Sequence, residues 1–293
     1  MPDTMELSKR TLGRTGLRVT QLGYGAMELR GAPRGRDITD DQAAQILRSV
    51  LDSGINYIDT SIDYGLSEER IGRFIGNRRS EFFLASKCGC PLQQAAQPTP
   101  GPAPHVFTRD NVVAGVEQSL RRLQTDYLDV VQFHSSPSKQ TLEEEGGLDA
   151  LLDLQRQGKV RFIGMSGTLP NLPEQIQMGV FDVFQIPYSA VQPEHEGLIS
   201  QAAAAGAGTV IRGGAAKGAW NGGELDDLTD GASPTEFILR YTLSHPDLHT
   251  TIVGTADPAH LQANVAAALK GPLPADVYAE AKRRLRTTTS EAG

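Results

Sequence analysis

Short apolar runs bounded by turn residues alternate with longer amphipathic segments along the chain. The apolar runs have the length and the boundaries of buried strands. The predicted strands are residues 21–25, 55–59, 82–87, 127–133, 160–166, 182–186, 209–212 and 250–253. The predicted helices are residues 40–52, 67–76, 108–124, 148–157, 171–178, 196–205, 233–244 and 258–269. Eight strands, each followed by a helix, predict an α/β protein with a (β/α)8 TIM-barrel fold.

Three segments lie outside this repeat. Residues 9–17 contain a Gly-Arg-Thr-Gly turn, which predicts an N-terminal hairpin that caps the barrel floor. Residues 91–107 contain five prolines, which exclude regular helix, and they follow the third strand on the face where barrel active sites lie. Residues 275–286 predict a C-terminal helix. We therefore expect a single domain over residues 1–293, with its core in residues 9–270.

A doubly wound sheet is the main structural rival. Its first strand leads into a G-x-G-x-x-G turn that opens a helix. Here the corresponding stretch, residues 23–28, reads Gly-Tyr-Gly-Ala-Met-Glu, and a polar loop follows before any helix. The third glycine is missing, so the barrel is favoured.

Composition excludes several classes of protein. The 293 residues carry a net charge of −7, which argues against a nucleic-acid partner but leaves room for a local site for an anionic cofactor. No apolar run approaches the roughly 20 residues that span a bilayer, and the first residues do not form a signal peptide. Cys88 and Cys90 are poorly placed to bridge each other. We expect a reduced, cytoplasmic protein without a membrane partner.

The two cysteines also raise the question of a metal. There is no second cysteine pair, and the histidines do not cluster in the sequence. We therefore interpret Cys88 and Cys90 as buried thiols and predict no metal site. The acidic run at residues 143–145 is interpreted as a solvated loop.

Four ionisable residues stand at or just after predicted strand ends: Asp59, Tyr64, Lys87 and His134. In a parallel barrel these ends converge on one mouth, where ionisable groups are costly unless they pair or have a function. Each residue alone is typical of a turn, a rim aromatic, a solvated lysine or a structural histidine. Their joint occurrence predicts a proton-transfer site.

The chemistry of the four side chains suggests a role for each. A phenol, with a reference pKa of about 10, is a weak acid at neutral pH, and a nearby ammonium lowers that pKa. We expect Lys87 to act in this way on Tyr64, and Asp59 to keep Lys87 charged and oriented. His134 would polarise a carbonyl oxygen by hydrogen bonding. Tyr64 would donate the proton as hydride reaches the carbon, and would accept it in the reverse reaction.

These residues, in their local settings, resemble the catalytic tetrad of the aldo-keto reductases. Residues 59–65, Asp-Thr-Ser-Ile-Asp-Tyr-Gly, resemble that family's Asp-Thr-Ala-x-x-Tyr-Gly stretch, and the resemblance extends over about residues 9–270. It implies an NAD(P)(H)-dependent oxidoreductase that reduces aldehydes or ketones to alcohols, with NADP(H) as cofactor and a small carbonyl or alcohol as substrate.

The resemblance also implies cofactor contacts around the mouth. Those near the nicotinamide are Gly25, Ala26, Met27, Asp59, Ser166 and Gln185. Those expected after the seventh strand are Ile211, Arg212, Gly213, Gly214, Lys217 and Gly218. Those at the adenosine end are Gly254, Thr255, His260 and Asn264. Ser166 and Gln185 are also open to interpretation as a polar network at the barrel mouth.

Several positions depart from the family pattern. Arg212 replaces an aromatic residue that stacks under the nicotinamide in many relatives; its guanidinium is suited to stacking, to the diphosphate or to an anionic substrate. Gly167 replaces an asparagine that follows the serine at position 166. Gly254 stands where some relatives have lysine, and Asp257 adds negative charge, although we expect Asp257 to be a helix N-cap. NAD(H) therefore stays possible beside NADP(H).

Three alternative functions differ from a reductase. One is an NAD-dependent aldose or alcohol dehydrogenase that works in the oxidative direction. Another is a cofactor-binding, redox-sensing subunit, which has no need for the complete tetrad. A metal-dependent hydrolase on the same barrel is disfavoured, because clustered ligands are missing from the sequence. The sequence leaves the substrate, the reaction direction and the oligomeric state open.

Overall fold

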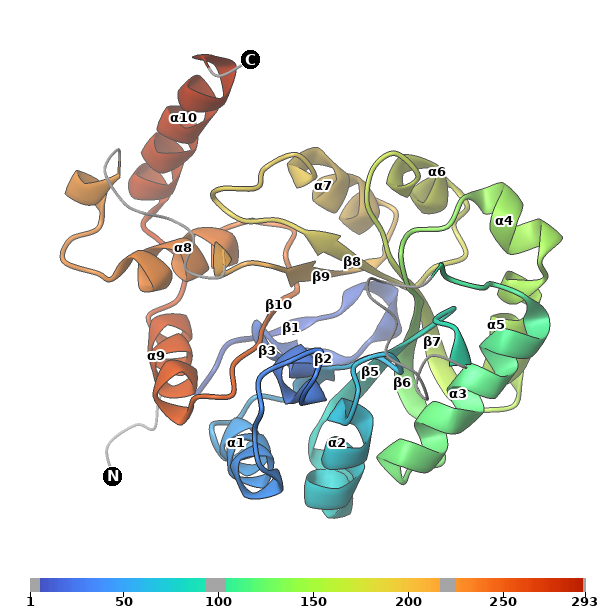
Figure 1. Cartoon of the computed structure of the whole chain (residues 1–293). Coiled ribbons are helices and arrows are strands. Elements are labelled where there is room, and N and C mark those ends of the chain that lie inside the picture. The colour runs from blue at the N-terminus through green and yellow to red at the C-terminus, as the bar shows by residue number, and fades with distance from the viewer. Residues whose placement is uncertain (1–5, 93–103, 217–224, 292–293) are drawn as a thin grey trace.

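The computed structural model describes residues 6–92, 104–216 and 225–291. Within these residues eight parallel strands close into a barrel in the order β10-β3-β4-β5-β6-β7-β8-β9. Figure 1 shows the helices arranged as an outer ring around these strands, with α10 extending away from the ring beyond α8. The predicted (β/α)8 barrel is confirmed.

The barrel strands agree closely with the apolar runs of the sequence. They are β3 Leu22–Gly25, β4 Tyr57–Asp59, β5 Phe83–Cys88, β6 Leu128–Phe133, β7 Val160–Ser166, β8 Val183–Pro187, β9 Gly208–Arg212 and β10 Thr250–Val253. The barrel closes where β10 pairs with β3, with Thr251 opposite Leu22. Most of these strand residues are buried, as expected of parallel strands that are covered by helices on one side and enclose a packed interior on the other.

The eight predicted helices are present, with shifts of about one residue at their ends. They are α1 Asp40–Asp52, α2 Ser67–Ile75, α3 Arg109–Leu123, α5 Gly147–Arg156, α6 Leu172–Gln177, α7 Glu196–Ala204, α8 Pro234–Leu243 and α9 Pro258–Leu269. In α1, Ile46, Leu47 and Val50 are fully buried against the barrel. Thr39 and Gln42 begin this helix with a capping box.

Two helices correct the sequence interpretation. Residues 143–145, expected to form a solvated loop, belong largely to α4 Lys139–Glu144. This short helix forms because the Oγ atom of Ser138 accepts the backbone N–H of Thr141 at 3.1 Å, which caps the first turn. The C-terminal helix, α10 Ala275–Glu291, continues beyond the predicted end at residue 286. Among the described helices, none combines the length and the apolar character that a membrane span needs.

The N-terminal hairpin is also present. Strands β1 Lys9–Thr11 and β2 Arg18–Thr20 pair antiparallel, with Arg10 opposite Val19. Buried side chains of this hairpin and its turn join a small apolar cluster with strand residues from the barrel interior: Leu12, Leu17, Val19, Tyr57, Ala85, Val130, Val183, Val210 and Ile252. The hairpin therefore closes the end of the barrel opposite to the predicted site.

Candidate active site

A buried ion pair joins two neighbouring strands at the mouth. Asp59 is the last residue of β4, and Lys87 is the penultimate residue of β5. The Nζ atom of Lys87 donates to Asp59 Oδ1 at 2.6 Å and to the carbonyl oxygen of Thr60 at 2.8 Å. Both side chains are almost completely buried, with 1% of Lys87 and 3% of Asp59 exposed. Removing water from two charges is costly, so this buried pair is expected to lower the stability of the fold relative to apolar residues at the same positions.

The second carboxylate oxygen of Asp59 extends the ion pair into a network. Gln132 Nε2 donates to Asp59 Oδ2 at 3.1 Å, and Gln185 Nε2 donates to the same oxygen at 2.8 Å. Ser166 Oγ then donates to Gln185 Oε1 at 3.3 Å. The structure thus brings Ser166 and Gln185, both predicted to contact the nicotinamide, into one buried network with Asp59. Gln132 was not among the predicted site residues, although it lies two residues before His134 on a buried strand.

Tyr64 reaches the same place from a tight turn after β4. The backbone N–H of Tyr64 donates to the carbonyl of Ser61 at 3.0 Å, and its own carbonyl accepts from Ser67 N at 2.8 Å. Gly65 has a φ of +46°, and a Cβ at this position would lie 2.3 Å from the carbonyl oxygen of Arg30. Only glycine fits here, which explains the Tyr-Gly pair of the motif. The turn places the Tyr64 ring so that Lys87 Nζ is 4.9 Å from its centroid.

Burial and the charges at the mouth set the protonation states of Lys87 and Tyr64. Burial disfavours the ammonium of Lys87, but Asp59, Tyr64 and Asp63 together outweigh this and raise the pKa of Lys87. Burial also raises the pKa of Tyr64, and Lys87 opposes that rise without reversing it. The expected effect of Lys87 on Tyr64 is therefore right in sign, but the expected net lowering of the Tyr64 pKa is wrong. At neutral pH Lys87 is charged and Tyr64 is a neutral phenol.

His134 follows β6 and faces both the phenol and a thiol. Its ring centroid is 6.1 Å from that of Tyr64 in an edge-on arrangement. Burial and the charge of Lys87 lower the pKa of His134 to about 3, so the imidazole is neutral at physiological pH. Its Nδ1 atom lies 3.2 Å from Cys90 Sγ. Burial raises the pKa of the Cys90 thiol, so the thiol keeps its proton and is able to donate in this contact. With the thiol as the donor, we assign the imidazole proton to Nε2, which leaves this nitrogen as a donor.

Arg212 contributes a second cation to the mouth. It is the last residue of β9, and its side chain is partly buried. Burial lowers the pKa of this guanidinium, while Tyr64 and Asp59 act in the opposite direction, so the side chain lies within electrostatic reach of both groups. No described residue forms an ion pair or a side-chain hydrogen bond with its guanidinium. A partly buried cation of this kind is suited to an anionic ligand.

The predicted backbone contacts lie beside this network. Gly25 ends β3 opposite Asp59, and Ala26 and Met27 open the short helical turn that follows. At the end of β9, Ile211 is buried and Gly213 has a φ of +76°. Gly214 follows and accepts a hydrogen bond from Thr242 Oγ1 at 2.7 Å. Lys217, Gly218 and most of the proline-rich segment lie outside the described residues.

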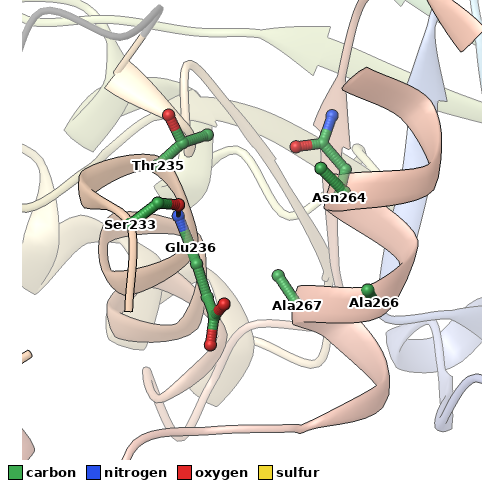
Figure 2. Close-up of a pocket in the computed structure, with 7 residues that line it drawn as sticks. Ser233, Thr235, Glu236, Asn264, Ala266 and Ala267 are labelled. Atoms are coloured by element: carbon green, nitrogen blue, oxygen red, sulfur yellow. Dashed lines mark hydrogen bonds between the residues drawn. The ribbon is translucent and has the colours of Figure 1, made fainter. Parts of the chain in front are cut away.

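The predicted adenosine contacts gather around the start of α9. Asp257 Oδ1 accepts the backbone N–H of Ala259 at 2.8 Å, so Asp257 is the helix N-cap, as expected. His260 is exposed, and its Nε2 atom lies 4.0 Å from Asp257 Oδ2. Thr255 and Asn264 are buried. Figure 2 shows that Asn264 forms one wall of a small pocket between α9 and the first turn of α8, with Ser233, Thr235 and Glu236 on the opposite wall.

The model of the aldo/keto reductase family matches residues 21–230, which is more than half of the chain. The chain belongs to the aldo-keto reductase family. It is therefore an oxidoreductase of this family, and its predicted membership is confirmed. The four tetrad positions all lie inside the matched region.

Similar proteins support this assignment over nearly the whole chain. L-galactose dehydrogenase from Arabidopsis thaliana is 28% identical over 89% of this chain and 88% of its own length. Pyridoxine 4-dehydrogenase from Escherichia coli is 28% identical over 85% of this chain and 89% of its own length. The holo form of the aldo-keto reductase AKR11C1 from Bacillus halodurans superimposes with a TM-score of 0.82 at 27% identity, covering 96% of both chains.

Two departures from the family pattern have a steric cause in this structure. A Cβ at Gly167 would lie 2.6 Å from Leu172 Cδ1 and 2.9 Å from Gln175 Oε1, so an asparagine at this position needs these two side chains to move. A Cβ at Gly254 would lie 2.5 Å from the carbonyl oxygen of Gly25, so a lysine is excluded there as long as β3 and β10 keep this spacing. Side chains of α6 therefore fill the space beside Gly167, and the backbone of Gly25 fills the space beside Gly254.

Proposed function

We propose that this protein is an NAD(P)H-dependent reductase that converts aldehydes or ketones to alcohols, with Tyr64 as the proton donor. One observation carries the proposal: a neutral phenol, a buried ammonium and a neutral imidazole meet at the mouth of an aldo-keto reductase barrel. This combination suits the transfer of one proton to a carbonyl oxygen. A binding protein or a redox sensor needs no such group of residues.

Each of the four side chains has a distinct role in this proposal. The reduced nicotinamide, when bound, supplies the hydride to the carbonyl carbon. His134 donates its Nε2–H to the carbonyl oxygen and orients it. Tyr64 gives its phenolic proton to that oxygen, which completes the alcohol and leaves a phenolate. The Lys87 ammonium stabilises this phenolate, and Asp59 holds Lys87 in place through the 2.6 Å hydrogen bond.

The residues at the mouth fit a dinucleotide. We propose that Ser166 and Gln185 hold the nicotinamide amide, because both are already oriented by the network around Asp59. The backbone of Gly25, Ala26 and Met27 would approach the ring from the adjacent strand. At the other end, Thr255, His260 and Asn264 would contact the adenosine. The resemblance implies NADP(H), whereas the carboxylate of Asp257 at the start of α9 favours a cofactor without an extra phosphate. The other nearby carboxylate, Glu236, is already paired with Lys270 and Arg240.

The first experiment is a fluorescence titration of the purified chain with NADPH and NADH in parallel. The tighter complex is then tested for turnover on a small panel of aldehydes and ketones. Binding of at least one dinucleotide together with turnover of a carbonyl supports the proposal. If neither dinucleotide binds, the proposal is wrong. If a dinucleotide binds but no carbonyl is reduced, the reductase activity is rejected and cofactor binding stands alone.

Arg212 offers a sharper test of the binding mode. We propose that its guanidinium contacts an anionic group, either the diphosphate or an acidic substrate, because it has no ionic partner among the described residues. The variant Arg212→Met should weaken binding by at least about tenfold, whereas Arg212→Lys should retain part of it. A change in the dinucleotide dissociation constant identifies the diphosphate. A rise in KM for a carboxylate-bearing aldehyde, without a rise for a neutral aldehyde, shows that Arg212 contacts the substrate.

A further inference from the structure

A thiol and two imidazoles meet beside the proposed reaction centre. The potential ligand atoms of Cys90, His105 and His134 all lie within 4.8 Å of one another. Cys90 Sγ is 3.2 Å from His134 Nδ1, and the rings of His105 and His134 meet edge-on with centroids 5.0 Å apart. These residues are far apart in the sequence, which is why the sequence predicted no metal ligands. The fold brings them together.

The backbone around the three side chains is fixed by hydrogen bonds. The N–H of Val106 donates to the carbonyl of Gly89 at 2.7 Å. Asn111 Nδ2 bridges the same two segments by donating to the carbonyls of Cys90 at 3.2 Å and Val106 at 2.8 Å. His134 N donates to the carbonyl of Cys88 at 3.0 Å. The segments that carry the three side chains are therefore held together before any ligand binds.

The His105 side chain is itself held in position. Its ring stacks on Phe107, with centroids 6.1 Å apart and an interplanar angle of 14°. Its Nε2 atom lies 3.2 Å from Ser135 Oγ. Phe107 is buried, and its backbone N–H donates to Glu145 Oε2 at 2.9 Å. His105 is thus packed against the core and directed towards His134.

We propose that Cys90, His105 and His134 form a binding site for a thiophilic divalent cation, represented experimentally by Zn²⁺. One thiolate and two imidazoles are ligands that zinc prefers, with Zn–S of about 2.3 Å and Zn–N of about 2.0–2.1 Å. Tetrahedral ligands at these lengths lie about 3.5 Å apart, so a small closure of the three side chains is sufficient. Three protein ligands leave the fourth position for water or a bound molecule.

The surroundings offer both a charge and a hydrogen-bond partner to such an ion. Asp63 Oδ1 lies 3.8 Å from His134 Nδ1 and accepts a hydrogen bond from Ser61 Oγ at 2.6 Å. The same Ser61 oxygen is 3.9 Å from Cys90 Sγ. Two cations act on His134: Lys87, which is already compensated by Asp59, and Arg212 at the end of β9. On binding, the thiol proton is released to solvent, and the thiolate and the Asp63 carboxylate balance the two positive charges of the ion.

Metal binding is measured on the full, untagged chain after chelator treatment, without dinucleotide. Zinc content and affinity are determined, and Co²⁺ replaces Zn²⁺ to report a thiolate-to-cobalt charge-transfer band. The wild type should bind one Zn²⁺ per chain. Because loss of an outer partner already lowers metal affinity about 10–100-fold, Cys90→Ser and His105→Gln should each weaken binding by at least about 100-fold. Cys90→Ser should also abolish the charge-transfer band.

Two matched variants control for non-specific effects. Cys88→Ser removes the other buried thiol, two residues away on the same segment, and His260→Gln removes an exposed histidine. Both should bind Zn²⁺ as the wild type does, and circular dichroism checks that every variant is folded. The proposal is wrong if the wild type binds no zinc, or if either control variant weakens binding as much as Cys90→Ser. Because these measurements involve no turnover, they are independent of the proposed reductase activity.

Discussion

Two layers of side chains inside the barrel, only two residues apart along the strands, differ sharply in character. The layer nearer the floor is apolar apart from one hydroxyl. Strands β4, β5, β6, β8 and β9 each contribute one residue to it: Tyr57, Ala85, Val130, Val183 and Val210. It packs against Leu12, Leu17 and Val19 of the N-terminal hairpin and its turn. In this layer burial of apolar surface stabilises the fold and creates almost no demand for hydrogen bonds.

The layer at the mouth comes from the same five strands, two residues further on: Asp59, Lys87, Gln132, Gln185 and Arg212. Since side chains alternate between the two faces of a strand, residues two apart share a face. Four of these five side chains form the buried hydrogen-bond network, and the fifth is the arginine without an ionic partner among the described residues. The floor layer therefore stabilises the fold, whereas the buried charges of the mouth layer lower stability and provide the groups for chemistry.

Removing the ammonium from the mouth layer should have the largest effect. Lys87→Met leaves the Asp59 carboxylate buried without its counter-charge, so the free energy of unfolding should fall by about 3–5 kcal/mol. Carbonyl reduction should fall below detection, because the phenolate of Tyr64 loses its stabilising charge. Urea unfolding and steady-state turnover measure the two effects.

The double variant Asp59→Asn/Lys87→Met separates stability from chemistry. It removes both charges and should recover most of the lost free energy of unfolding, but none of the activity. If the double variant is as unstable as Lys87→Met, the unpaired carboxylate is not the cause of the instability, and the assigned cost of the ion pair is wrong.

Removing one oxygen atom from Tyr64 should affect rate almost alone. Tyr64→Phe deletes the proposed proton donor, so kcat should fall by about 10²–10⁴-fold. The free energy of unfolding should change by about 1 kcal/mol or less, because the ring and its contact with Lys87 are retained. Dinucleotide affinity, measured by the same fluorescence titration, should stay within a few-fold of the wild type. A variant that keeps its kcat would show that another group donates the proton.

The positions of these layers were predictable from the sequence to different degrees. Strand positions and the barrel followed from apolar runs, because the period of side-chain burial is local. Asp59, Lys87 and His134 were predictable because parallel strand ends must converge. The direction in which the Tyr64 pKa shifts was not predictable from the sequence. It depends both on how deeply the ring is buried and on its distance from Lys87.

Long-range contacts account for what the sequence could not reveal. Gln132 resembles any polar residue on a strand until the fold places it 3.1 Å from Asp59. His105 lies in a proline-rich stretch without periodicity, and only the return of this segment to Gly89 brings it to Cys90 and His134. Helix α4 was missed because a six-residue helix with a local cap leaves little periodic signal.

A cavity in the floor layer should reduce stability and spare the chemistry. Val130 is fully buried in the apolar cluster, two residues before Gln132 on β6. Val130→Ala removes two buried methyl groups and should lower the free energy of unfolding by about 2 kcal/mol. Under conditions where the variant is folded, kcat should stay within about twofold of the wild type. A large loss of kcat in the folded variant would show that the two layers are mechanically coupled.

The smallest effect is expected from Tyr57→Phe, which removes the one hydroxyl of the floor layer. This oxygen is buried and has no hydrogen-bond partner among the described residues. An unsatisfied buried polar group costs about 1–3 kcal/mol, so its removal should leave the free energy of unfolding unchanged or raise it by about 1 kcal/mol. Turnover should not change. Tyr57 at the start of β4 and Tyr64 in the turn that follows β4 thus form a matched pair in which the same atom is deleted. Only Tyr64→Phe should lower kcat, and neither variant should lose more than about 1 kcal/mol of stability. A clear loss of stability in Tyr57→Phe would mean that the hydroxyl forms a hydrogen bond within the barrel, and that the floor layer contains a polar interaction.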